Sequence, residues 1–274
     1  MFRLYRSFAT VFVFLMFSVG AVTLGTVVNL IIELIVRNKD KKQQILRYLV
    51  KKSFQFIVRI CSIFSVFKVK FRNIDLLEQK HGYVIISNHP TLADYLILYS
   101  RLNNSTTVMV ADKLNRTFMR KIICNMGYVS NNVDAEKITT ILSDSDNILI
   151  FPEGTRTRNS KYLKFHRGAV NFSIRNQMPI IPIFIKCSEP TFLSDKFFNW
   201  KAPETTPVFS ISVGNVIDYR NLINTNDPTS IQIRKLNNYL EKLYNREIQS
   251  AEETVPPSKK RLKNIQTYKK STPK

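Results

Sequence analysis

The sequence predicts an α/β protein with one domain, in which helices flank a mixed, largely parallel sheet, and with an additional N-terminal membrane helix. Three observations predict this class. Short β-rich apolar runs alternate with helical patterns between about residues 68 and 246. Two polar motifs stand directly after two of these runs. The first 36 residues contain an uncharged stretch long enough to cross a bilayer.

The N-terminal stretch has no charged side chain from Ser7 through Ile32. A membrane span needs about 20 predominantly apolar residues, whereas the apolar region of a signal peptide has about 7–15. The length favours a membrane anchor over residues 1–36, and a cleaved signal peptide is the competing interpretation because Arg3 and Arg6 precede the run. More basic residues follow the run than precede it, so the positive-inside rule places the rest of the chain in the cytoplasm.

Residues 37–70 form the next expected unit, a basic and apolar helical segment. Its stretch Phe54–Phe67 is rich in Phe, Ile and Val, carries Arg59 and is bounded by lysines. That length and those flanks fit an interfacial helix, and they equally fit an amphipathic helix packed on the domain.

The main domain is expected over residues 71–248. Its helices alternate with its strands, and the helix expected at 91–102 has apolar residues at helical spacing. Strands are expected at 84–87, 107–110, 148–151, 180–185 and 208–213. Helices are expected at 91–102, 115–125, 135–142, 168–176 and 230–246.

The charge balance indicates an anionic partner. The formal net charge is +21, and the tail expected over residues 249–274 is basic and lacks order-promoting composition. A phospholipid surface, nucleic acid and an acyl-phosphate substrate all fit this charge. Three widely spaced cysteines indicate a reducing compartment, and three scattered histidines predict no metal site.

The first polar motif is Asn88-His89-Pro90-Thr91-Leu92-Ala93-Asp94. Pro90 keeps His89 out of helical geometry, so that His89 faces the crevice at the end of the strand. Asp94 lies about one turn into the following helix, within reach of His89. A carboxylate on one imidazole nitrogen fixes the tautomer and leaves the other nitrogen as a general base. The alternative is that His89 only caps the helix and that Asp94 is favourable there simply because it lies in the first helical turn.

The second motif is Phe151-Pro152-Glu153-Gly154-Thr155-Arg156. Gly154 permits an unusual backbone turn, and Arg156 can bind a phosphate through two hydrogen bonds. Glu153 is expected to orient an arginine or a substrate hydroxyl. Because parallel strands end at one edge of a sheet, both motifs should face one crevice and supply a base beside an anion site. A solvated loop also explains the basic residues that follow.

Together the two motifs resemble the first and third signature blocks of the glycerolipid acyltransferases, of the lysophosphatidic-acid (1-acyl-sn-glycerol-3-phosphate) type. Phe165–Ala169 resembles the basic Gly-Ala stretch that follows in this family. Ile180–Ile183 resembles its fourth block, a strand with an internal proline. The order and spacing agree from about Gly82 to Val213.

The resemblance implies acyl transfer, without a cofactor, from acyl-CoA or acyl carrier protein to the hydroxyl of a lysophospholipid. Lysophosphatidic acid, which would give phosphatidic acid, is the expected acceptor. His89 would deprotonate the acceptor hydroxyl and Asp94 would orient His89. The expected partners are these substrates and anionic membrane lipid, at a bacterial inner membrane. The substrate-binding residues that the resemblance implies are Glu153, Gly154, Thr155, Arg156 and Arg167.

The second block departs from the family pattern. Gly127–Asp134 has no arginine where the family commonly has one, and His166 stands where a lysine is frequent. Acylation of a specialised lipid or an aryl polyene glycolipid is therefore an alternative, and the His89-Pro90-Thr91 turn is similar to that of a divergent bacterial subgroup. A non-catalytic, membrane-tethered binding protein is the other alternative. No nucleic-acid partner is expected, because zinc spacings, recognition helices and RNA-binding motifs are missing from the sequence.

Overall fold

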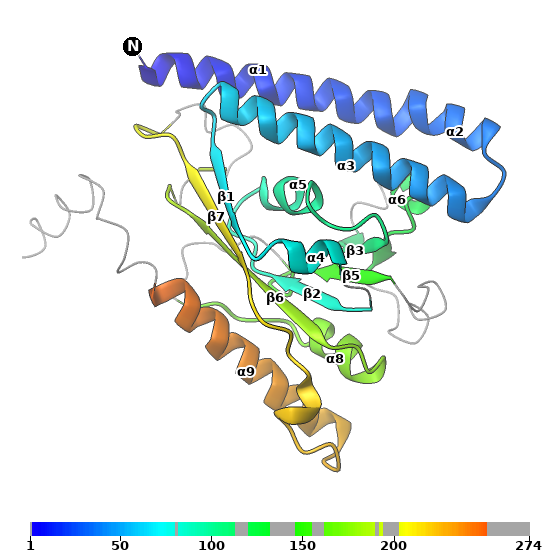
Figure 1. Cartoon of the computed structure of the whole chain (residues 1–274), viewed down its shortest axis with the longest axis vertical. Coiled ribbons are helices and arrows are strands. Elements are labelled where there is room, and N and C mark those ends of the chain that lie inside the picture. The colour runs from blue at the N-terminus through cyan, green and yellow to red at the C-terminus, as the bar shows by residue number, and fades with distance from the viewer. Residues whose placement is uncertain are drawn as a thin grey trace, which may run out of the picture.

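A seven-stranded sheet forms the centre of the computed structural model, which describes residues 2–79, 82–112, 120–131, 146–154, 162–189, 192–193 and 203–250. Its strand order is β1-β7-β6-β2-β5-β3-β4 (Figure 1). Every neighbouring pair is parallel except β6 and β7, which confirms the predicted mixed, largely parallel sheet. The strands are β1 (Lys68–Arg72), β2 (Val84–Ser87), β3 (Thr106–Val110), β4 (Val129–Ser130), β5 (Asn147–Ile150), β6 (Ile180–Cys187) and β7 (Val208–Val213).

Helices cover both faces of this sheet. One face is covered by α3 and α5, and the other by α8 and α9 (Figure 1). The helices and helical turns are α1 (Phe2–Thr23), η1 (Leu24–Val28), α2 (Asn29–Ile35), α3 (Lys39–Ile63), α4 (Asp75–Gln79), α5 (Asp94–Tyr99), α6 (Arg120–Asn125), α8 (Gly168–Arg175), η3 (Tyr219–Asn221) and α9 (Thr229–Ser250).

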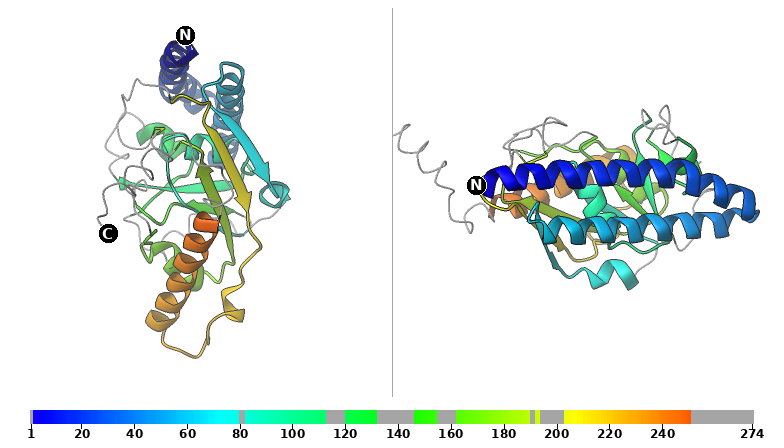
Figure 2. Two further views of the ribbon diagram at one scale, coloured as in Figure 1. Left: turned by 90° about the vertical axis from the view of Figure 1, so that its left-hand side faces the viewer. Right: turned by 90° about the horizontal axis from the view of Figure 1, so that it is seen from above.

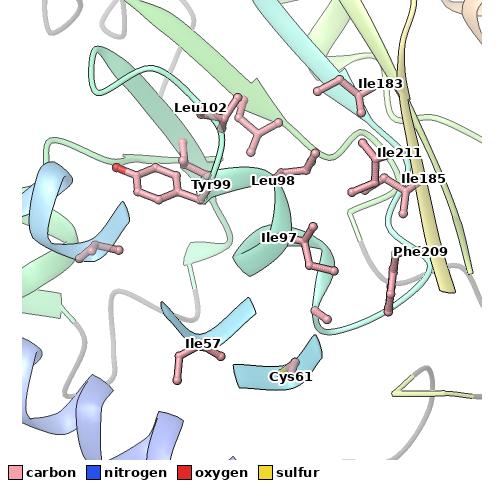
Figure 3. Packing of buried hydrophobic residues seen from close by; sticks show 14 of the residues in the cluster. Ile57, Cys61, Ile97, Leu98, Tyr99, Leu102, Ile183, Ile185, Phe209 and Ile211 are labelled. Atoms are coloured by element: carbon pink, nitrogen blue, oxygen red, sulfur yellow. The ribbon is translucent and has the colours of Figure 1, made fainter. Parts of the chain in front are cut away.

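Each face of the sheet buries its own hydrophobic cluster. Successive side chains of a strand point to opposite faces, so Ile85 of β2 packs with the cluster under α3 and α5, and Ile86 packs with the cluster under α8 and α9. Figure 3 shows the first cluster, where α5 meets α3 on one side and strands β6 and β7 on the other. A sheet buried on both faces explains why β2 and β5 are uniformly apolar.

The N-terminal helix lies along the domain as one arm of a helical hairpin. The apolar segment Arg3–Ile35 is the one helix in the described residues that is long and apolar enough to cross a membrane, and only 11% of its most apolar window is buried. It runs beside α3 in all views (Figures 1 and 2). A single turn of π-helix, Leu24–Val28, interrupts it, and Asn38 caps the returning helix by accepting a hydrogen bond from Lys41 N.

This helix is held to the domain from end to end. Near its start, the guanidinium of Arg6 donates to the carbonyl of Glu204. Near its end, the buried Asn29 accepts a hydrogen bond of 2.9 Å from the amide of Asn125 in α6. A second face stays apolar and exposed. Its large exposed side chains are Leu4, Tyr5, Phe8, Phe12, Leu15, Val19, Val22, Val27, Leu30, Ile31, Leu34 and Ile35.

Several elements differ from the sequence expectation. β1 begins at Lys68, inside the unit expected over 37–70, and neither β1 nor β4 is predicted by the apolar pattern. The stretch 54–67 continues α3 to Ile63, where Ile57 and Cys61 enter the core, so it packs on the domain. The helix expected at 91–102 forms only at Asp94–Tyr99, because residues 90–93 form the turn that precedes it. The helix expected at 135–142 and residues 251–274 of the tail lie outside the described residues.

Candidate active site

The two polar motifs lie at one edge of the sheet. β2 and β5 are parallel neighbours, with Ile86 paired to Ile150, so both chains leave the sheet at the same edge. His89 follows β2, and Glu153 follows β5. The crevice outside the carboxyl ends of such strands is the usual ligand site of open α/β sheets.

Asn88 fixes the turn after β2 to the neighbouring strand β6. Its buried side chain donates to the carbonyl of Ile185 and accepts from the N–H of Ile185, both at 2.8 Å. An amide that pairs with both backbone groups of one residue extends the parallel ladder by one rung after the strand itself has ended. The next residue, His89, therefore has a fixed backbone position.

His89 and Asp94 meet as the sequence spacing predicts. His89 Nδ1 lies 2.9 Å from Asp94 Oδ2. The carboxyl side chain of Asp94 is completely buried, whereas 22% of the His89 side chain is exposed. Thr91 completes the arrangement, because its N–H donates to Oδ2 and its hydroxyl donates to Oδ1 of Asp94, both at 2.7 Å. These contacts orient the imidazole and leave Nε2 as the ring nitrogen that does not face Asp94.

The environment of Asp94 shifts its acidity in opposing ways. Burial raises the pKa of the Asp94 carboxyl above its ordinary value of 3.8, while the hydrogen bonds from His89 and Thr91 favour the charged form and oppose this shift. On the other side, the His89 ring packs against Phe151, with ring centroids 4.6 Å apart. The imidazole is thus held between a buried carboxyl group and an aromatic ring.

Glu153 holds the backbone of the His89 turn. Its Oε1 accepts a hydrogen bond of 2.8 Å from His89 N. The sequence predicts a different use of this side chain, in which it orients an arginine or a substrate hydroxyl. The contact joins the two motifs directly, because it runs from the turn after β5 to the turn after β2.

Gly154 occupies a position where a side chain would not fit. Its φ is +65°, in the left-handed region, and a Cβ placed there would lie 2.9 Å from Cδ2 of His166. The N–H of His166 donates to the carbonyl of Pro152 at 2.7 Å. The glycine therefore permits both the tight turn and the close approach of the His166 ring.

Of the remaining predicted site residues, the structure describes only Arg167. Arg167 is exposed at the start of α8 and lines a cavity of about 320 Å³ with Gly168, Asn171, Ser230 and Ile233. Thr155 and Arg156 lie outside the described residues. The part of the chain that the structure describes contains no group of three or more His, Cys, Asp or Glu side chains that could hold a metal ion.

Two residues support this site through contacts that the sequence does not predict. Thr91 is recognisable only as a cap residue, although its two hydrogen bonds satisfy the buried carboxyl group. Tyr244 of α9 is buried, and its hydroxyl donates to the carbonyl of Ile86 at 2.6 Å, just before the His89 turn. Ile86 and Tyr244 are 158 residues apart in the sequence, so no local motif predicts this contact.

Known proteins resemble this chain over the region that contains the site. Residues 68–186 match the acyltransferase family. The 1-acyl-sn-glycerol-3-phosphate acyltransferase alpha of Mus musculus is 27% identical over 146 residues, which are 50% of this chain and 51% of the mouse protein. The corresponding Homo sapiens protein is 27% identical over 126 residues, 42% of this chain and 44% of its own length. The chain thus matches about half the length of these curated relatives.

A solved structure shares the fold over almost the whole chain. The crystal structure of PlsC, the 1-acyl-sn-glycerophosphate (LPA) acyltransferase of Thermotoga maritima, superposes with a TM-score of 0.64 over 91% of this chain and 98% of that protein, at 15% sequence identity. This likeness supports the fold alone, whereas the family match covers both motifs. The region that matches the acyltransferase family thus contains both motifs, and the curated relatives that this chain resembles there are 1-acyl-sn-glycerol-3-phosphate acyltransferases.

Proposed function

We propose that this protein is a membrane-associated O-acyltransferase that moves an acyl chain from acyl-CoA or acyl carrier protein to the hydroxyl of a lysophospholipid. Lysophosphatidic acid is the proposed acceptor and phosphatidic acid the product. The observation that carries this proposal is the pair formed by the partly exposed His89 and the buried Asp94, 2.9 Å apart, at the edge of the sheet. The names of the curated relatives supply the acceptor class.

In the proposed reaction, His89 Nε2 removes the proton of the acceptor hydroxyl as its oxygen attacks the thioester carbonyl. Asp94 stabilises the imidazolium that results. The tetrahedral intermediate then collapses, the new oxygen ester forms, the carbon–sulfur bond breaks, and the leaving thiolate takes the proton from His89. A positioned base of this kind contributes roughly 10²–10⁴-fold to the rate.

The anionic group of the acceptor is proposed to bind beside the His89 turn. Gly154, Thr155 and Arg156 would hold the phosphate, with Glu153 keeping the two turns together through His89 N. A different acceptor, such as a specialised lipid or an aryl polyene glycolipid, is the second candidate. It is favoured by the missing arginine in the second block, residues 127–134.

The membrane contact is proposed to lie on the N-terminal hairpin. α1 and α2 expose an apolar face along their length, while contacts at Arg6 and Asn29 hold the opposite face to the domain. A helix fastened at both ends to the domain would have to detach in order to cross the bilayer. We therefore favour a helix that lies in the membrane interface and keeps the site at the lipid surface.

The test is a lipid mass-spectrometric assay on membranes that contain the wild type, His89→Ala or His81→Ala. Acyl-CoA and acyl carrier protein donors are each supplied with lysophosphatidic acid and a panel of other lysolipids. We expect phosphatidic acid to form with the wild type and the His81→Ala control, and transfer to be lost in His89→Ala while membrane association is unchanged. Transfer only to another acceptor selects the second candidate. Near wild-type activity of His89→Ala contradicts the proposed base.

A further inference from the structure

The C-terminal helix α9 contacts the sheet directly behind the His89 turn. The hydroxyl of Tyr244 donates to the carbonyl of Ile86 at 2.6 Å and accepts from the N–H of Ile183 at 3.2 Å, so it joins β2 to β6 at one rung. The rings of Phe165 and Phe184 pack against Tyr244, with centroids 4.9 and 4.7 Å away. Burial raises the pKa of Tyr244 well above its ordinary value of 10, and nearby Glu153 acts in the same direction, so the hydroxyl stays a donor.

The same helix also holds the extended segment 163–165 that leads to His166. The side chain of Asn245 accepts from Leu163 N at 2.7 Å and donates to Leu163 O at 3.2 Å. One turn earlier, Glu241 Oε1 accepts from Phe165 N at 2.8 Å. A third side chain, Asn237, donates to the carbonyl of Phe165 at 3.3 Å. Spaced four residues apart on one face of the helix, these side chains pair with this segment much as a neighbouring strand would.

The His89 turn and the segment that leads to His166 both contact the turn that follows β5. His89 N donates to Glu153, and His166 N donates to the carbonyl of Pro152. The turn Pro152–Gly154 is therefore flanked by two chain segments, and each of them is tied to α9. The helix lies beyond residues 68–186, which match the family, and Figure 1 shows it along the face of the sheet opposite α3.

We propose that α9 is a positioning element for acyl transfer, in which Tyr244 sets the His89 turn and Asn245, with Glu241 and Asn237, sets the segment that carries His166. This inference rests on the proposed function. The turn that carries His89 should affect the rate of the chemical step. The segment that carries His166 lies beside Gly154 and should affect binding of the anionic acceptor. The two groups of contacts should therefore act on different kinetic constants.

The test compares purified Tyr244→Phe, Asn245→Ala and the exposed control Lys242→Ala, each checked by thermal unfolding. A small displacement of reacting groups can cost large factors in rate, so Tyr244→Phe should lower kcat about tenfold with little change in the acceptor KM. Asn245→Ala should raise the KM for lysophosphatidic acid about fivefold with a smaller change in kcat. Asn245→Asp keeps the acceptor for Leu163 N and should recover part of the lost affinity. Lys242→Ala should match the wild type.

Amide hydrogen exchange gives a second readout that does not depend on activity. Tyr244→Phe should speed exchange at His89, and Asn245→Ala should speed it at Leu163 and His166. Wild-type kinetics and unchanged exchange in both variants would overturn the inference, as would equal losses of kcat that simply follow a lower melting temperature. If the wild type transfers no acyl chain, the proposed function fails by itself, and the exchange rates still decide whether α9 holds the two segments.

Discussion

The carboxyl group of Asp94 is completely buried, and burial disfavours its charged form. Burial raises its pKa in the folded protein above 3.8, so the folded state binds more protons than the unfolded state between the two values. Stability from this group is therefore lost as the pH rises through that window, and the charged form carries a folding cost at neutral pH. The carboxyl group is expected to serve the reaction rather than stability.

This cost leads to a prediction for Asp94→Asn. The amide can place its oxygen at the Oδ2 position and its NH₂ toward the Thr91 hydroxyl, without a buried charge. We expect the variant to unfold at a temperature equal to or above that of the wild type at pH 7, with the difference shrinking as the pH falls toward 3.8. Thermal unfolding across this pH range measures it. A large loss of stability at pH 7 would mean that the charged carboxylate stabilises the fold.

Glu153 allows a second prediction at the scale of one hydrogen bond. Glu153→Gln keeps an oxygen for His89 N, whereas Glu153→Ala leaves that N–H without this acceptor, at a cost of about 1–3 kcal/mol if water cannot replace it. We expect kcat to change less than about threefold in the glutamine variant and to fall roughly tenfold or more in the alanine variant. Steady-state kinetics distinguishes them. Equal losses in both would assign the role to the negative charge of Glu153.

Among the elements, the exposed face of α1 is the proposed membrane contact. Phe12 and Leu15 lie on this face, and each apolar side chain that enters lipid contributes about 1.5–3 kcal/mol. We expect Phe12→Asp with Leu15→Asp to lower vesicle binding at least about tenfold in a flotation assay. The matched control places two aspartates at Val216 and Leu222, which are exposed apolar residues of the domain. An equal loss of vesicle binding in the control would mean that the added negative charge, and not the lost apolar face of α1, lowers the binding.

Elements were predictable where local patterns decide them. β2 and β7 have the predicted bounds, because uniform burial or alternation marks them in the sequence. β1 also alternates, but Lys68 and Lys70 directly follow the apolar stretch 54–67 and fit the basic flank of a helix equally well, and the partner strand β7 lies far along the chain. The His89–Asp94 contact spans five residues and could be predicted, whereas the Glu153–His89 contact and the α9 contacts depend on long-range packing.

For the whole molecule, the net charge of +21 should add a long-range attraction to anionic lipid to the proposed apolar contact of α1. Anionic lipid attracts basic residues near its surface by about 1 kcal/mol each, and salt screens this term. We expect binding to anionic vesicles to fall at least about tenfold between low salt and 0.5 M salt, while the weaker binding to neutral vesicles changes little. Flotation at several salt concentrations measures both. Salt-independent binding to anionic vesicles would leave the charge without a role in membrane contact.

We propose that His89 and Asp94 act as one catalytic unit in acyl transfer to lysophosphatidic acid. The most direct measurement is a double-mutant cycle on kcat, with the wild type, His89→Ala, Asp94→Asn and the double variant. Residues that act together are strongly non-additive, so each single change should cost roughly 10²–10⁴-fold and the double variant should be no slower than His89→Ala. Losses that multiply in the double variant, or single variants that keep wild-type rates, would show that His89 and Asp94 do not act as one catalytic unit.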